Sequence, residues 1–157
     1  MVNTDPTDEE INAFQSAARD LISVALHSLD AVGDGMSLPQ MRLLLALNDL
    51  GRCASSRVAD ALGLGASSVT RLADRLSASG HVLRGTDPRH RSVVTLELST
   101  RGRDLVARVL AWRREEFERI LSRIDPALRA PAAQALREFH AVVGEGYAAE
   151  LPGPVPL

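Results

Sequence analysis

Apolar side chains recur every three or four residues through most of the chain, which is the spacing of amphipathic helices. The first such segment covers residues 7–30, where Thr7 and Glu10 have the spacing of a capping box and acidic residues occupy the first turn. A second helix, residues 37–50, opens with the same spacing and ends before a glycine. The chain is therefore predicted to begin with two helices.

Two shorter helices are predicted at residues 55–62 and 66–78, separated by a turn that contains Gly63. Their apolar positions have the spacing of a helix-turn-helix, with the small residue Ala59 where the two helices would cross. The second helix presents short polar side chains and one arginine near its N-terminal end, the part of a recognition helix that enters a major groove. An ordinary pair of packed helices is the alternative interpretation.

From His81 onward the apolar period becomes two, which is typical of β-strands. Thr86-Asp87-Pro88 supplies a turn, and residues 94–98 alternate between apolar and other side chains. The pattern predicts a β-hairpin with arginines at its tip, which could reach phosphates or a narrow minor groove. A solvated turn would also be charged, but a basic hairpin directly after a helix-turn-helix is the arrangement of a winged helix.

Two long helical segments complete the pattern, one capped by Ser99 and one that opens at Asp125-Pro126 and ends near Tyr147. Pro131 predicts a loose or 3₁₀ turn over residues 126–130 before the regular helix. The apolar faces of the first helix and the last two exceed what a centre of about 60 residues could cover, so a dimer is predicted.

The predicted fold class is mainly α with a small β-hairpin: a winged helix-turn-helix with long N- and C-terminal dimerisation helices. Residues 1–157 are expected to form a single domain. Its winged helix-turn-helix lobe covers residues 37–98, its dimerisation helices cover residues 7–30 and 99–148, and residues 149–157 form an irregular, proline-rich tail.

The formal net charge of −2 conceals a division of charge along the chain. Residues 1–38 hold seven acidic side chains and one basic one, residues 39–123 hold nine acidic and fifteen basic, and residues 124–157 hold four acidic and two basic. All 18 basic residues are arginine, whose planar guanidinium suits phosphates and guanine edges, although a GC-rich genome would give the same excess. The basic middle coincides with the predicted helix-turn-helix.

Composition excludes several classes of protein. The longest apolar run, residues 43–47, is far shorter than the roughly 18 residues of a membrane span, and the acidic N-terminal segment is unlike a signal peptide, so a cytoplasmic protein is expected. Cys53, the single cysteine, forms no internal disulfide, and the four histidines are scattered, so neither a metal site nor a cofactor is expected. No catalytic constellation is recognisable, which argues against an enzyme.

Several groups of residues together form a specific pattern: Leu38-Pro39-Gln40, residues 58–64, residues 67–76 with Gly80, Arg84 before Asp87-Pro88, and residues 98–102. Over residues 38–110 this pattern resembles the MarR (multiple antibiotic resistance regulator) family of transcription factors. The resemblance implies a homodimer joined by the first, fifth and sixth helices, with the fourth helix in the major groove and the hairpin in the minor groove. It also implies a small-molecule pocket between the dimer helices and the DNA-binding lobe.

The hairpin departs from the family pattern, because family members usually show Asp-Arg-Arg where this chain has His90-Arg91-Ser92. Asp87, Arg89 and Arg91 remain, so DNA contact by the hairpin is still predicted. Asp74 and Arg75 could bind outward or hold the hairpin through Asp87, and an intramolecular pair is favoured for Asp74.

The predicted DNA-binding residues are Ser67, Ser68, Thr70, Arg71, Arg75, Arg89, His90 and Arg91. The leading hypothesis is a dimeric, sequence-specific DNA-binding regulator, a ligand-responsive repressor. Its target would be a near-palindromic operator in double-stranded DNA with half-sites roughly 34 Å apart. The alternative is a winged-helix protein-interaction module with weak, non-specific DNA binding.

Three other features have both a structural and a functional interpretation. His27 is expected to be a surface or interface histidine rather than a ligand or pH-sensing group. Cys53, with Arg52 beside it, is expected to be a structural or incidental thiol rather than an oxidant sensor. Trp112 and Phe117 are expected to belong to the interface core rather than to a ligand pocket.

Overall fold

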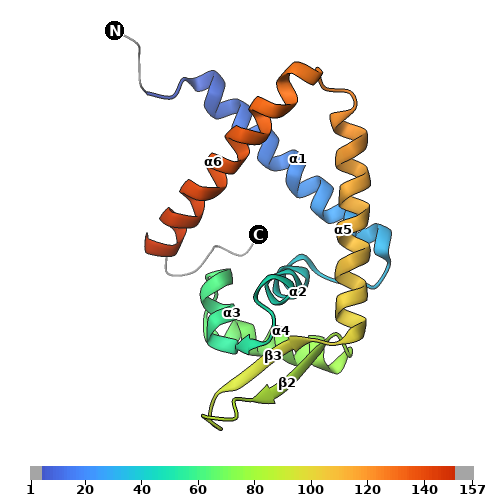
Figure 1. Ribbon diagram of the computed structural model, residues 1–157, viewed down its shortest axis with the longest axis vertical. Helices are drawn as coiled ribbons and strands as arrows, with labels where there is room; N and C mark the ends of the chain where they lie inside the picture. Colours follow the sequence, from blue (N-terminus) through green and yellow to red (C-terminus); the bar gives the residue numbers. More distant parts are fainter. Residues whose placement is uncertain (1–4, 151–157) are drawn as a thin grey trace.

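The computed structural model describes residues 5–150, with side chains up to residue 143 (Figure 1). Its elements, in chain order, are α1 (Asp8–Val32), α2 (Leu38–Leu50), β1 (Cys53–Ala54), α3 (Ser55–Leu62), α4 (Ala66–Ala78), β2 (Val82–Thr86), β3 (Val94–Leu98), α5 (Thr100–Leu121) and α6 (Pro126–Glu150). The predicted fold class is confirmed, since the described chain is mainly helical with one small antiparallel sheet.

The elements form two parts (Figure 1). Helices α2, α3 and α4 and the sheet make one lobe, called the recognition lobe below. Helix α5 extends away from it to meet α1, which crosses α5. At the far end of α5 the chain turns, and α6 folds back across α1. The recognition lobe and the helices predicted to dimerise are therefore joined mainly through α5.

Local sequence explains where the first two helices begin. The Thr7 hydroxyl accepts a hydrogen bond from the Glu10 amide, and the Thr7 amide donates to the Glu10 carboxylate over 2.7 Å. The Glu10 carboxylate accepts from both the amide and the hydroxyl of Thr7, and these two hydrogen bonds lower the pKa of Glu10 from its ordinary value. Ser37 and Gln40 repeat this arrangement at the start of α2, with the Ser37 amide 2.9 Å from the Gln40 side-chain oxygen. Both predicted capping boxes are confirmed.

The hydrophobic core lies in the recognition lobe and continues along the first half of α5. Its fully buried members come from α2, α3, α4, β2, β3 and α5: Met41, Leu43, Leu44, Leu47, Val58, Val69, Ala73, Leu76, Val82, Leu96, Leu105, Val106 and Val109. From α1, only Leu29 among the hydrophobic residues that the structure describes is buried. The recognition lobe is thus the part of the chain with a core of its own.

The sheet has three strands in the order β1-β3-β2, and not only the two of the predicted hairpin. Cys53 pairs with Leu96 and Ala54 with Thr95, both antiparallel. A two-residue strand is too short to show a period, which is why the pattern did not reveal it. Thr95 is buried, and Arg52 and Gly85 lie against its side chain.

The prediction of a loose or 3₁₀ turn over residues 126–130 is wrong, since α6 is helical from Pro126 onward and Pro131 lies inside it. Pro126 occupies the first helical position, which tolerates proline, and the Asp125 side chain accepts from the Ala127 amide. Pro131 removes a single helical hydrogen bond within an alanine-rich stretch that favours helix on both sides. Residues 149 and 150 also belong to α6 and not to the predicted tail, whose residues 151–157 lie outside the described chain.

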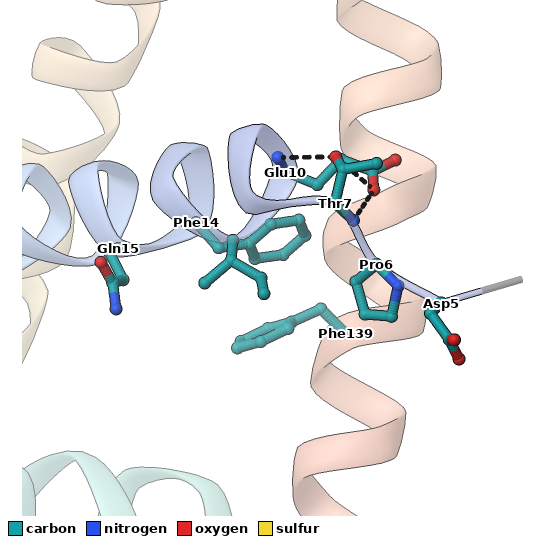
Figure 2. Close-up of a pocket in the computed structure, with 8 residues that line it drawn as sticks. Asp5, Pro6, Thr7, Glu10, Phe14, Gln15 and Phe139 are labelled. Atoms are coloured by element: carbon teal, nitrogen blue, oxygen red, sulfur yellow. Dashed lines mark hydrogen bonds between the residues drawn. The ribbon is translucent and has the colours of Figure 1, made fainter. Parts of the chain in front are cut away.

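Helix α6 has little contact with the rest of the chain. The rings of Phe14 and Phe139 face each other between α1 and α6, with their centroids 5.6 Å apart and tilted by 40° (Figure 2). None of the side chains described for α6 is buried. A helix in water needs an apolar face packed against a partner, so α6 lacks its main source of stability in a single copy of the chain.

Candidate nucleic-acid interface

Helices α3 and α4 are joined by the tight turn that the glycine spacing predicts. Gly63 adopts a left-handed conformation, with φ at 60°, and its amide donates to the Asp60 carbonyl over 3.1 Å. The Leu64 amide donates to the Ala59 carbonyl over 2.9 Å. The two helices bury Val58, Ala59, Leu62, Val69, Ala73 and Leu76 on their inner sides. The segment is therefore a helix-turn-helix and not merely two consecutive helices.

The outer face of α4 carries the predicted recognition residues. Ser67, Thr70, Arg71 and Arg75 are exposed, and Ser68 is half-buried. The Arg71 guanidinium donates to the Ser68 hydroxyl over 3.3 Å, and the Thr70 hydroxyl donates to the carbonyl of the first helical residue. No side chain caps the helix at Gly65, so its N-terminal amides are open to an acceptor from outside.

The tip of the β2–β3 hairpin, called the wing below (residues 87–93), is fixed by one side chain. The Asp87 carboxylate accepts from the amides of Arg89, at 2.7 Å, and His90, at 3.3 Å. The Asp87 amide donates to the Val93 carbonyl over 3.0 Å, closing the turn. Arg89, His90 and Arg91 are all exposed on it. Asp87 thus shapes the turn that presents these three residues.

An ion pair between Asp74 and Arg84 connects α4 to β2. The intramolecular role favoured for Asp74 is therefore confirmed, but the predicted route through Asp87 is wrong, because Asp87 accepts from the wing backbone instead. Arg75 is exposed and forms no ion pair among the described residues. The pair fixes the base of the wing relative to the recognition helix.

Arg52 supports the wing from the opposite side, a role that the sequence did not suggest. Its guanidinium donates to the Thr86 carbonyl over 3.3 Å and to the Thr95 hydroxyl over 3.5 Å. A Cβ atom at Gly85 would lie 3.0 Å from the Thr95 hydroxyl oxygen and 3.3 Å from the guanidinium. The glycine therefore leaves room for Arg52 to reach across the strands.

His81 is a buried polar residue that contacts the end of α4 and the start of α5. It lies between α4 and β2 and is 2% exposed. Its Nδ1 is 2.8 Å from the Ser79 hydroxyl, its Nε2 accepts from Arg101 Nε over 3.2 Å, and Asp34 lies 3.7 Å from Nε2. Arg108 binds the same Asp34 oxygen at 3.2 Å. Burial lowers the pKa of His81 from its ordinary value, and Arg101 lowers it further, whereas Asp34 opposes the shift.

This lowered pKa predicts that stability falls with acidification. Well above about pH 6.5 the imidazole is neutral in the folded and unfolded chains alike. Below that pH the unfolded chain takes up a proton that the folded chain does not, so the free energy of unfolding falls by up to about 1.4 kcal/mol per pH unit. The loss levels off once the pH is below the folded pKa.

Urea denaturation at several pH values between 7.5 and 5.5 measures this effect. His81→Gln should remove most of the decline, and His140→Gln, at an exposed position on α6, should leave it unchanged. An equal decline in wild type and His81→Gln would contradict the assignment to His81.

Ser99 and Gly102 join the start of α5 to the same region. The Ser99 hydroxyl donates to the Gly80 carbonyl over 2.6 Å and accepts from the Gly102 amide over 3.0 Å. The Ser99 amide donates to the His81 carbonyl. The predicted cap of this helix is confirmed, and it also ties α5 to the end of the recognition helix.

Two residues with alternative interpretations lie away from these contacts. Cys53 is half-buried in β1, and burial raises the pKa of its thiol while nearby Arg57 opposes the shift, so the unreactive protonated form is favoured. His27 is exposed, with Nδ1 3.4 Å from the Ser23 hydroxyl.

In the described part of the chain, no cluster of side chains could hold a metal ion and no helix is long and apolar enough to cross a membrane.

The fold and the site together define a winged helix-turn-helix protein. Residues 34–91 match the model of the MarR family. The chain is 28% identical over 124 residues to YfiV of Bacillus subtilis, described as an uncharacterised HTH-type transcriptional regulator, covering 73% of this chain and 78% of that protein.

Two solved structures extend this similarity to nearly the whole chain. RV1404 from Mycobacterium tuberculosis is 30% identical, with a TM-score of 0.80 over 90% of this chain and 97% of that one. FabT of Streptococcus pneumoniae, solved in complex with DNA, is 17% identical, with a TM-score of 0.75 over 88% of this chain and 99% of that one. The chain belongs to the MarR family of transcriptional regulators.

Proposed function

We propose that this protein is a dimeric, sequence-specific DNA-binding regulator that recognises a near-palindromic site in double-stranded DNA. The observation that carries the proposal is the exposed polar face of α4 beside an arginine-bearing wing whose position is fixed by Asp74–Arg84 and by Arg52. A recognition helix and a wing in fixed relation can contact two grooves of one duplex.

The charges of this face suit a polyanion. Asp74 is paired with Arg84, and Asp87 is occupied by backbone amides. Arg75, Arg89 and Arg91 are exposed without an ion-pair partner among the residues that the structure describes. Phosphates could therefore bind these arginines without displacing an internal carboxylate.

A second copy of the chain is the occupant that we propose for the exposed apolar faces of α1, α5 and α6. Large hydrophobic residues more than one-third exposed lie along these three helices and at the turn before α6: Ile11, Phe14, Leu21, Ile22, Leu26, Leu110, Phe117, Leu121, Ile124, Leu128, Leu136, Phe139 and Val142. Monomers rarely leave so many large apolar side chains in water on neighbouring helices. Trp112, half-buried on α5, and Phe117 would then belong to the interface, as predicted.

Sedimentation velocity tests the dimer. At about 10 μM the protein should sediment as a dimer. Leu136→Asp, which places a charge on the apolar face of α6, should shift it to a monomer because the buried charge would be unpaired. Leu83→Asp is the matched control, since Leu83 is equally exposed but lies on β2. A monomeric wild-type protein, or a dimer unaffected by Leu136→Asp, would contradict this arrangement.

Selection from random duplexes tests the recognition itself. A symmetric dimer should enrich a near-palindrome whose half-sites lie about one helical turn, roughly 34 Å, apart. Failure to enrich any sequence would favour the alternative, a winged-helix protein-interaction module with weak, non-specific DNA binding.

We further propose that the protein acts in the cytoplasm and that a small molecule controls its binding to DNA. Membership of the family supports a repressor whose affinity for its operator falls when a small molecule alters the distance between the two recognition helices. Thermal stabilisation of the dimer by compounds that also release DNA would identify such an effector.

A further inference from the structure

We propose that His81 is a positioning residue for DNA binding: its neutral imidazole fixes the recognition helix against α5, and a proton on Nε2 exchanges its partners and weakens binding. This inference rests on the proposed function, because it assigns a control point to the same DNA-binding surface. No contact between His81 and DNA is involved, since the side chain is 2% exposed.

The position of His81 makes it a junction between the two parts of the molecule. It follows α4 and immediately precedes β2, so it lies where the recognition helix continues into the wing. The charged groups that face the imidazole are Asp34, from the connection between α1 and α2, and Arg101 and Arg108, from α5. On the α4 side it meets the hydroxyl of Ser79. A change at His81 therefore acts on the orientation of α4 relative to the helices that we propose join the two copies.

Hydrogen-bond donors and acceptors around the neutral ring select one tautomer. Arg101 Nε is always a donor, so Nε2 must be the acceptor and the proton lies on Nδ1. Nδ1–H then donates to the Ser79 hydroxyl, whose own hydrogen donates to the Leu76 carbonyl over 3.2 Å. Every group in this chain has a partner, which makes the neutral junction a defined arrangement rather than a loose contact.

A second proton on the ring cannot be accommodated without rearrangement. Protonated Nε2 becomes a donor, so Arg101 loses its acceptor and faces a like charge. The nearest acceptor is Asp34, 3.7 Å away, whose oxygen is already bound by Arg108. Closing the His81–Asp34 pair would move the α1–α2 connection toward β2 and release Arg101. The two protonation states thus have different partners across the same junction, which is the requirement for a two-state switch.

Fluorescence-anisotropy titrations between pH 8.0 and 5.5, at constant ionic strength, test the inference with the selected operator and a scrambled duplex. We expect the wild-type operator affinity to fall at least about fivefold between pH 7.5 and 5.5, the lower range of allosteric couplings. His81→Gln, which retains an acceptor for Arg101 but does not titrate, should change less than about twofold. His140→Gln, at an exposed position on α6 outside the DNA-binding lobe, is the control and should keep the wild-type profile. A pH-independent wild type, or equal slopes in wild type and His81→Gln, would overturn the proposal.

Two further measurements separate positioning from simple loss of structure. Circular dichroism at each pH confirms that the protein is folded where binding is measured. The imidazole ¹⁵N shifts of His81 at pH 8 should show the Nδ1–H tautomer, and Asp34→Asn should move the midpoint of the binding profile to lower pH, because it removes the negative charge that favours the protonated ring. An Nε2–H tautomer or an unmoved midpoint would overturn the inference. Loss of operator preference already at pH 8 would instead refute the proposed function.

Discussion

Gly102→Ala should lower the free energy of unfolding by at least about 2 kcal/mol, although alanine is the better helix former. A Cβ at this position would overlap the carbonyl oxygen of His81 and lie 3.3 Å from Leu98 Cδ2. The carbonyl belongs to the backbone and also accepts from the Ser99 amide, so it cannot move aside as a flexible side chain would. The helix-propensity gain of about 1 kcal/mol is too small to offset the displacement of α5 from β2.

Chemical denaturation measures this loss, with Gly65→Ala as the matched control. Gly65 has a φ of −66° and open space around its missing side chain, so alanine there should change stability by less than about 1 kcal/mol. If Gly102→Ala were as stable as wild type, α5 could not approach the end of the recognition helix as closely as described.

Arg71→Ala should weaken operator binding by about 1–3 kcal/mol and relax the preference at one base pair of each half-site. The guanidinium lies exposed near the N-terminal end of α4, where its only hydrogen bond to a described residue is with the Ser68 hydroxyl. Arg91→Ala, on the wing, should weaken binding as well, and more evenly across sequences if it contacts phosphate. Because both side chains are exposed, neither change should unfold the protein.

Anisotropy titrations with the selected operator, and with single-base variants of it, measure both effects. Arg137→Ala is the matched control, since Arg137 is an exposed arginine on α6, distant in the chain from the recognition lobe. Unchanged affinity in both Arg71→Ala and Arg91→Ala would refute the assignment of the DNA-binding surface.

Local signals in the sequence predicted the helix-turn-helix well. The bounds of α3 and α4 agree with the predicted helices. Glycines mark where these helices end, and apolar residues recur every three or four positions within them. The capping boxes of α1 and α2 were likewise readable, since each involves residues only three positions apart. Features of this kind depend on the residues within one or two helical turns.

Contacts between distant residues were not readable from such patterns. Arg52 reaches Thr86, at the base of the wing and 34 positions further along the chain, and His81 meets Asp34 and Arg101 from two other segments. Arginine and histidine at these positions look like ordinary surface residues until the fold brings their partners together. The one available signal was Gly102, whose place inside a helix indicates a close approach by another part of the backbone.

Binding of the purified protein to DNA from upstream of its own gene, compared with scrambled DNA across a salt series, tests the central claim most directly. The account predicts that a dimer binds one site at least about 10³-fold more tightly than the scrambled duplex at physiological salt, with a salt dependence equivalent to several phosphate contacts per duplex. Equal, weak binding to both duplexes, together with failure to select any sequence from random DNA, would contradict it.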